Sequence, residues 1–141
     1  TKAPKAYFLD IGLVCYLTGI RDRAHLLQGP LAGPLFENYC IQETVKHYCN
    51  AGLRPPLYYL RTSNGLEADL LIEKSHQELI LAEMKVSKTP APAMAASLLR
   101  VKKNFGDLPV KQGFLVSMSE RTLQLAAEVK AVPLDVFLQH L

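Results

Sequence analysis

Two acidic residues and a lysine lie on neighbouring apolar segments of this chain. Asp69 belongs to the segment 67–73, and Glu83 and Lys85 come near the end of the apolar run 78–86. Side-chain alternation and aliphatic content predict that both segments are strands, and the polar residues between them predict a hairpin. Carboxylates and a lysine on adjacent strands suit divalent-metal-dependent hydrolysis of phosphate esters.

The register of this hairpin decides whether the two carboxylates meet. We expect a three-residue loop at 75–77, with Lys74 opposite Glu78 and Ile72 opposite Ile80. In that register the two acidic residues lie opposite each other on one face of the sheet. A loop with an even number of residues would shift the pairing by one and put them on opposite faces.

Opposed carboxylates destabilise a sheet unless something neutralises them. Mg²⁺ or Mn²⁺ held by Asp69 and Glu83 would do so and would keep coordination positions open for a phosphate oxygen and a water. Lys85 points to the same face and would position that water. The alternative is a solvent-facing strand surface with a cross-strand Lys85–Glu67 ion pair, worth about 0–1 kcal/mol.

Glu37 is a candidate third member of this acidic group. Pro34 suits the start of a helix that runs to about Asn50. This helix has one apolar stripe, formed by Cys40, Ile41, Thr44, Val45 and Tyr48. Glu37 lies in the middle of the stripe, where a carboxylate is costly unless it is paired or binds a metal. Its place in the first helical turn, which the helix dipole favours, is an alternative reason for it.

Five basic residues are weaker candidates for contacts with a nucleic-acid backbone, and the net charge of +3 is compatible with such a partner. Arg61 would equally neutralise the acidic group, and the three on the later helix would equally be a solvated helix end. The five are Arg61, Lys88, Arg100, Lys102 and Lys103.

The rest of the chain predicts alternating helices and strands, hence an α/β fold with a mixed central sheet flanked by helices. The expected elements are a helix at 11–17 capped by Asp10, a linker at 21–33, a strand at 57–61 with a hairpin turn at 63–65, a helix at 93–105, a strand at 113–118, a helix at 120–130, and a short strand and helical turn within 132–138.

Length and composition indicate one globular unit, with 141 residues, 49% of them hydrophobic and 21% charged. We expect an N-terminal helical segment and linker at 1–30 and the core at 31–141. No apolar stretch approaches the ~20 residues of a membrane span. The N-terminus has no secretory signal pattern, so we expect a cytoplasmic protein.

The ordered set Glu37, Asp69, Glu83 and Lys85 resembles the PD-(D/E)XK nuclease-like superfamily, which implies a restriction-endonuclease-like core. Further stretches resemble the uncharacterised domain found C-terminal to an AAA-type ATPase module in bacterial and archaeal proteins. These stretches are 7–13, 33–37, 58–61, 67–69 and 83–85.

The resemblance implies a nuclease-like domain that hydrolyses phosphodiesters in nucleic acid with Mg²⁺ or Mn²⁺. Catalytic roles fall to the four matched residues, with the metal on Asp69 and Glu83. The chain has no P-loop motif, so we expect a fragment whose ATP-dependent partner is its own N-terminal ATPase, in a full-length protein that can oligomerise. The alternative is a non-catalytic module that binds nucleic acid or another protein and regulates the ATPase.

Overall fold

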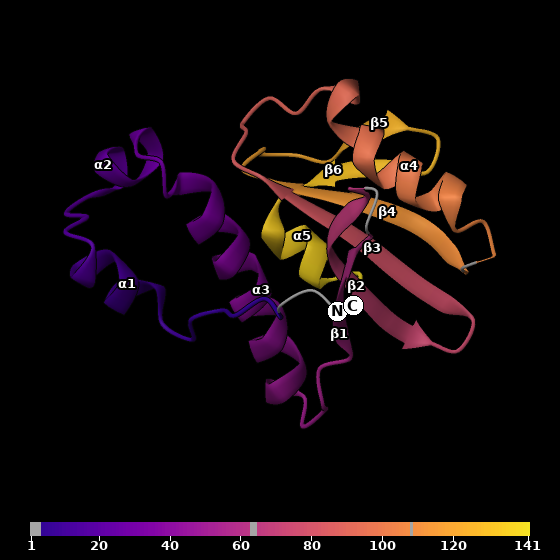
Figure 1. The fold of residues 1–141 in the computed structure, drawn as a ribbon, viewed down its shortest axis with the longest axis horizontal. Coiled ribbons are helices and arrows are strands. Elements are labelled where there is room, and N and C mark those ends of the chain that lie inside the picture. Colours follow the sequence, from indigo (N-terminus) through magenta and orange to yellow (C-terminus); the bar gives the residue numbers. More distant parts are fainter. Residues whose placement is uncertain (1–3, 63–64, 108) are drawn as a thin grey trace.

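A mixed β-sheet with helices on both faces forms the centre of the protein (Figure 1). The computed structural model describes residues 4–62, 65–107 and 109–141, and within them the sheet has six strands in the order β1-β2-β3-β4-β6-β5. Their bounds are β1 (Leu57–Arg61), β2 (Glu67–Ser75), β3 (Glu78–Lys85), β4 (Val110–Ser117), β5 (Leu123–Ala126) and β6 (Val129–Val132).

The sheet combines antiparallel and parallel pairing. Strands β1, β2 and β3 pair antiparallel, β3, β4 and β6 pair parallel, and β5 runs antiparallel to β6. The parallel pair β3–β4 needs a crossover, which the helix between these strands provides. The α/β class with a mixed central sheet flanked by helices is therefore confirmed.

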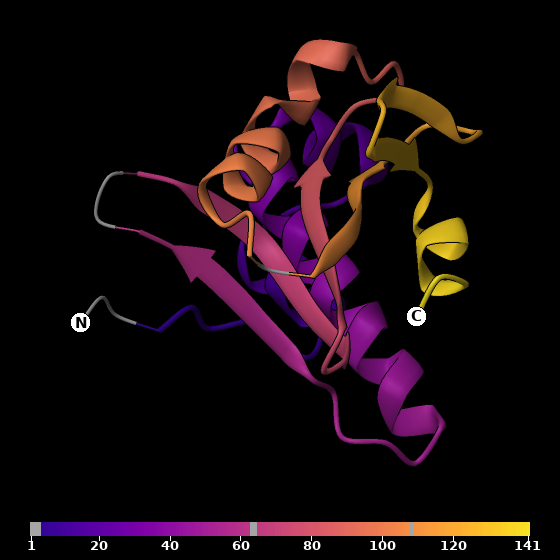
Figure 2. The ribbon, with the colours of Figure 1, turned by 90° about the vertical axis from the view of Figure 1, so that its right-hand side faces the viewer.

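The helices divide between the two faces of the sheet (Figures 1 and 2). One face carries α3 (Ala32–Asn50) and α5 (Leu134–Leu138), and the other carries η1 (Pro92–Ala95) and α4 (Ala96–Asn104). Two short helices, α1 (Ile11–Leu17) and α2 (Arg23–Gln28), extend from the start of α3. Among the described residues, no helix combines the length and hydropathy needed to cross a membrane.

Each face of the sheet has its own core, as strand alternation requires. On the α3 side, Ile72, Ile80 and Phe114 pack against Cys40 of α3 and Phe137 of α5. On the α4 side, the buried residues include Leu81, Leu98, Val101, Leu115 and Val129. Successive residues of β3 and β4 thus serve opposite layers.

The β2–β3 hairpin has the expected register but not the expected loop. Ile72 faces Ile80, as predicted, whereas Ser75 pairs with Glu78, so the loop holds two residues and the predicted pairing of Lys74 with Glu78 is wrong. A β-bulge between Glu73 and Ser75 adds one residue to β2. This extra residue cancels the one-residue shift that an even loop causes.

A second irregularity of β2 lies at the predicted acidic position. Tyr58 pairs with Leu71 and Leu60 pairs with Ala68, so Asp69 and Leu70 together face one residue of β1. Ala68 belongs to the core on the α4 side, and Leu70 to the core on the α3 side. The strand therefore changes faces at Asp69, as a bulge allows.

Three elements differ from expectation or could not be compared with it. The segment 120–130 is not a helix, because the apolar residues Leu123 and Leu125 alternate and pair as β5 with β6, so sheet pairing overrides helix propensity. The expected linker 21–33 contains α2, whose first turn is capped by the Asp22 carboxylate. The turn expected at Ser63 and Asn64 lies outside the described residues.

Candidate functional site

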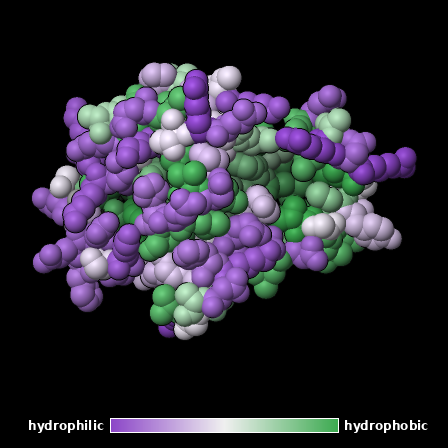
Figure 3. Space-filling view, turned by 180° about the vertical axis from the view of Figure 1, so that it is seen from behind, coloured by the Kyte–Doolittle hydropathy of each residue, from purple (hydrophilic) through white to green (hydrophobic). Residues whose placement is uncertain are grey.

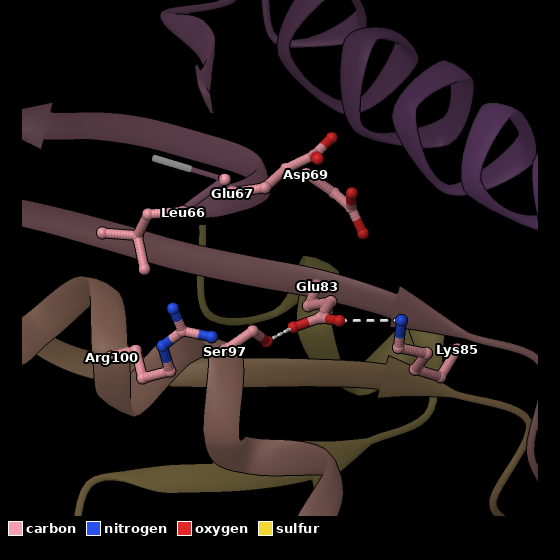
Figure 4. Close-up of a pocket in the computed structure, with 8 residues that line it drawn as sticks. Leu66, Glu67, Asp69, Glu83, Lys85, Ser97 and Arg100 are labelled. Atoms are coloured by element: carbon pink, nitrogen blue, oxygen red, sulfur yellow. Dashed lines mark hydrogen bonds and ion pairs between the residues drawn. The ribbon is translucent and has the colours of Figure 1, made fainter. Parts of the chain in front are cut away.

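Three of the four predicted catalytic residues, Asp69, Glu83 and Lys85, line one pocket of about 290 Å³ beside α4 (Figure 4). Strand β2 contributes acidic side chains, β3 contributes Glu83 and Lys85, and α4 contributes a hydroxyl and a guanidinium. We call this the acidic pocket. Its other lining residues are Gly65, Leu66, Glu67, Ser97 and Arg100.

Asp69 is held by contacts on both of its carboxylate oxygens. Oδ2 accepts a hydrogen bond from the backbone N–H of Met84, 3.0 Å away. Asp69 lies one residue beyond Leu70, and Met84 two residues beyond Ala82, the last pair of β2 and β3. Oδ1 lies 3.6 Å from the ammonium of Lys5. Burial nevertheless raises the pKa of Asp69 above its ordinary value, against the opposing effect of the Met84 N–H and with a further rise from Glu37.

Glu83 is a buried carboxylate with 8% exposure. Its Oε1 lies 2.8 Å from the ammonium of Lys85, and its Oε2 accepts a hydrogen bond from the Ser97 hydroxyl (Figure 4). Burial raises the pKa of Glu83, although Lys85 opposes this rise. The hydrogen bond that Lys85 makes to Glu83 raises the pKa of Lys85, so this lysine is charged at neutral pH.

Lys5 stands beside the acidic pocket and contacts three carboxylates. Its Nζ lies 3.1 Å from Glu37, 3.4 Å from Glu67 and 3.6 Å from Asp69. It also lies 5.9 Å from the centroid of the Tyr59 ring, a cation–π distance. Burial lowers the pKa of Lys5, but the three carboxylates outweigh burial and raise it above the ordinary value.

Residues 4–9, which we call the N-terminal strap, bring Lys5 to this place. The Asn38 side chain of α3 bonds both the N–H and the carbonyl of Phe8, each at 2.8 Å. Gln42 donates to the carbonyl of Leu9 at 2.6 Å. The Tyr7 hydroxyl donates to Glu37 at 2.7 Å. The strap is therefore fixed to α3, because side chains of α3 bond the backbone N–H and carbonyl groups of the strap.

Glu37, the third predicted carboxylate, belongs to the Lys5 side of the site. It accepts hydrogen bonds from Lys5 and Tyr7 and lines a neighbouring cavity under the strap. It does not line the acidic pocket that Asp69 shares with Glu83. Asp69 and Glu67 link the two groups, because each contacts Lys5 and also lines the acidic pocket.

The five predicted basic residues are dispersed. Arg100 lines the acidic pocket, and Arg61 lies 3.6 Å from Glu67. Lys102 instead pairs with Glu128 at 2.6 Å, while Lys88 and Lys103 are exposed. The alternative Lys85–Glu67 ion pair does not form, since Lys85 pairs with Glu83 and Glu67 pairs with Lys5 and Arg61.

Sequence reasoning missed three contributors to this site: Lys5, Tyr7 and Ser97. Lys5 and Ser97 are isolated polar residues without a spacing that links them to the acidic group. Tyr7 carried a signal, because it begins one of the stretches that support the family resemblance. Its hydroxyl reaches Glu37 only because the strap crosses α3, which no local pattern reveals.

The acidic pocket offers oxygen ligands of the kind that Mg²⁺ prefers. Mg²⁺ binds proteins through one or two carboxylates and keeps several waters, so Asp69 and Glu83 match it in type and number. Burial raises the pKa of both carboxyls, so their charged forms are costly here and a cation that stabilised them would offset that cost. Within the described ranges, no group of three or more His, Cys, Asp or Glu side chains is arranged to hold a metal. The two carboxylates therefore fit an ion whose remaining coordination positions are filled by water or substrate.

Comparison with known proteins places the chain beside longer relatives. The family described as "Domain of unknown function (DUF4143)" matches residues 32–137. The proteins named Mb2031c, from Mycobacterium bovis, and Rv2008c, from Mycobacterium tuberculosis, are both called uncharacterized. Each is 31% identical to this chain over 138 residues, or 97% of its length. The chain spans 29% of the length of these relatives.

One solved structure is also similar, a half-complex from a tetradecameric assembly of Thermococcus gammatolerans McrB AAA+ hexamers with bound McrC. The similarity has a TM-score of 0.45 and 15% sequence identity, and it covers 72% of this chain and 27% of that one.

Proposed function

Because this chain belongs to the DUF4143 family, whose description names no activity, we propose its function from the acidic pocket. The pocket binds one divalent cation through Asp69 and Glu83 and hydrolyses phosphodiester bonds of nucleic acid on a restriction-endonuclease-like core. The observation that carries this proposal is that the buried Glu83 and the partly buried Asp69, both with raised pKa values, share one pocket with Lys85. Buried carboxylates are costly unless they bind something positive.

The bound cation would polarise the phosphate and lower the pKa of a water in its shell. Asp69 is oriented for this task by the Met84 N–H on its Oδ2. Glu83 is oriented by Ser97 and Lys85 on its two oxygens. Lys85, being charged, stabilises the negative charge that develops on the phosphate, and Arg100 on the pocket wall attracts the backbone of the substrate.

The experiment is cleavage of plasmid DNA, single-stranded DNA and RNA by the purified chain with Mn²⁺ or Mg²⁺. Asp69→Asn and Glu83→Gln should each lower the rate at least about 100-fold. Glu73→Gln is the matched control, because Glu73 is another β2 carboxylate but pairs with His76 outside the pocket. Absence of cleavage, or equal rates in all variants, would remove the catalytic proposal. Salt-dependent binding without cleavage would favour a non-catalytic nucleic-acid module.

We also propose that the chain is one module of a longer protein that contains an AAA-type ATPase. The chain spans 29% of its curated relatives, so those proteins contain other regions. In this arrangement the ATPase is the direct partner of the module. Expression of a full-length relative with and without this module, followed by ATPase assays, tests the coupling.

A protein-interaction module is a second candidate, favoured by the surface of the N-terminal segment. Several large apolar side chains are exposed there, and Figure 3 shows hydrophobic surface gathered towards the end of the molecule that α1 and α2 form. Exposed apolar groups in one segment often mark a contact surface. These side chains are Phe8, Leu9, Leu13, Tyr16 and Leu17.

Replacing two of these residues separates the two candidates. Leu13→Glu with Tyr16→Ser should abolish association with the rest of a full-length protein in a pull-down. Nuclease activity of the isolated chain should stay within about twofold, since surface changes outside the pocket have small effects. Unchanged association would remove the interaction proposal.

A further inference from the structure

The acidic group on the strap side already contains a cation, the ammonium of Lys5. Its three carboxylate contacts, at 3.1, 3.4 and 3.6 Å, come from α3 and from two positions of β2. The side chain is 23% exposed, so solvent screens these contacts only partly. Three carboxylates around one ammonium leave excess negative charge, which holds the lysine in its charged form.

Asp69 is shared between this ammonium and the acidic pocket. Oδ2 is engaged by the Met84 N–H, so Oδ1 is the oxygen on which Lys5 acts. A divalent cation near Asp69 would be repelled by the lysine charge and would compete with it for the same carboxylate. Lys5 therefore lowers the affinity of Asp69 for any second cation.

The strap holds the backbone that carries Lys5 against α3. Asn38 and Gln42 fix the strap backbone at Phe8 and Leu9, only three and four residues beyond Lys5. Asn38 is 6% exposed, so its two hydrogen bonds are shielded from water. An ammonium placed by buried bonds is a fixed feature of the site rather than a mobile surface charge.

We propose that Lys5 is a built-in cation of the site, which lies against Glu37, Glu67 and Asp69 and lowers the affinity of Asp69 for a divalent ion. The divalent ion is then held on the Glu83 side of Asp69, and Lys5 sets its affinity. This inference rests on the proposed function only in taking Asp69 as an ion ligand.

Calorimetric titration of the 141-residue chain with Mn²⁺ tests the proposal directly. Lys5→Met keeps the length of the side chain and removes its charge. This variant should bind Mn²⁺ at least about tenfold more tightly than the unsubstituted chain, which corresponds to about 1.4 kcal/mol. Lys5→Gln should behave in the same way, which provides a second neutral variant if the first folds poorly.

Two variants separate the charge of Lys5 from a merely structural role. Lys5→Arg keeps the charge and should bind Mn²⁺ within about threefold of the unsubstituted chain. Tyr7→Phe removes the other hydrogen bond to Glu37 without changing charge and should also leave Mn²⁺ affinity unchanged. A destabilised site would bind the ion more weakly, so tighter binding by the neutral variants alone identifies a competing charge.

The outcomes distinguish this inference from the nuclease proposal. Unchanged, weaker or absent Mn²⁺ binding in both neutral Lys5 variants overturns the role of Lys5, whether or not the chain cleaves nucleic acid. Tighter binding in those variants supports it even if no variant shows cleavage, in which case only the nuclease proposal fails.

Discussion

Ile72 lies directly opposite Ile80, although only two unpaired residues, His76 and Gln77, connect their strands. A loop with an even number of residues would normally shift the pairing of the two strands by one residue. That shift would place the side chains of one strand on the opposite face of the sheet. The β-bulge beside Lys74 restores the register. The proximity of Asp69 to Glu83 therefore depends on an irregularity several residues away from both.

Deletion of Lys74 should be tolerated, because the shortened strand can pair regularly with Ile72 still opposite Ile80. We expect the free energy of unfolding to fall by less than about 1 kcal/mol, partly from the lost hydrogen bond of Lys74 to the His140 carbonyl. Urea unfolding measures this. Deletion of Leu71 is the contrasting variant, since it changes the register between the bulge and the site and should unfold the domain. Equal stability of the two deletions would contradict the role assigned to the bulge.

Glu83→Gln should leave the protein at least as stable as before at pH 7. Burial raises the pKa of Glu83, so the folded chain holds its proton more strongly than the unfolded chain does. Stability from this group is complete below the unfolded pKa and is lost as pH rises through the raised folded pKa. Thermal melts at pH 4 and pH 7 should show the variant's advantage only at pH 7. As a control, Glu128→Gln removes an exposed ion pair with Lys102 and should cost at most about 1 kcal/mol.

Asn38→Ala should release the N-terminal strap from α3. The change removes both hydrogen bonds to Phe8 from a site that is nearly buried, and we expect a loss of about 1–3 kcal/mol. Limited proteolysis should then cut within residues 4–9 faster than in the unsubstituted chain. Asn50→Ala, at the exposed end of α3, is the matched control and should leave the cutting rate unchanged. Equal rates in both variants would show that other contacts hold the strap.

Phe137→Ala should cost about 3–5 kcal/mol of unfolding free energy. The ring is fully buried and meets the Phe114 ring edge-on, with 5.5 Å between centroids, so its removal opens a cavity between α5 and the sheet. Tyr16→Ala gives the comparison, because Tyr16 is 80% exposed and should change stability by less than about 0.5 kcal/mol. Chemical denaturation monitored by circular dichroism measures both.

Stability should fall as the solution is acidified through the titration of His140. Burial lowers the pKa of this imidazole, and the charges of Lys130 and Lys74 lower it further. The unfolded chain therefore binds the proton more readily, so the stabilising contribution is present above about pH 6.5 and is lost as pH falls through the lower folded value. His140→Gln should flatten this part of the pH profile in thermal melts. A variant that follows the original profile would contradict this assignment.

The sequence predicts the elements of this fold well where local chemistry is decisive. The helix at 11–17 begins with the Asp10 carboxylate accepting from the Leu13 N–H, as capping predicts. The strand at 57–61 and the helix that carries Glu37 also lie where expected. The helix predicted at 120–130 is wrong, because its residues favour a helix in isolation but form strands in the sheet. Strand β6 pairs with β4 on one side and with β5 on the other.

The candidate site is only partly accessible to sequence reasoning. The sequence points to Asp69, Glu83 and Lys85, and the structure brings these three into one pocket. The sequence does not reveal that Glu37 pairs with Lys5, because that contact depends on how a distant segment crosses α3. Long-range placement follows from tertiary packing, which local propensity does not encode.

The strap gives the site an unusual dependence on the order of events during synthesis. Lys5 is made before its partner Asp69, which follows 64 positions later, and Glu83 comes later still. A growing polypeptide on the ribosome thus exposes the ammonium long before the carboxylates that hold it exist. Whatever the pocket binds, it can bind in its final form only when these distant residues have come together, so a product that ends before Glu83 would carry Lys5 and Asp69 but not the assembled centre.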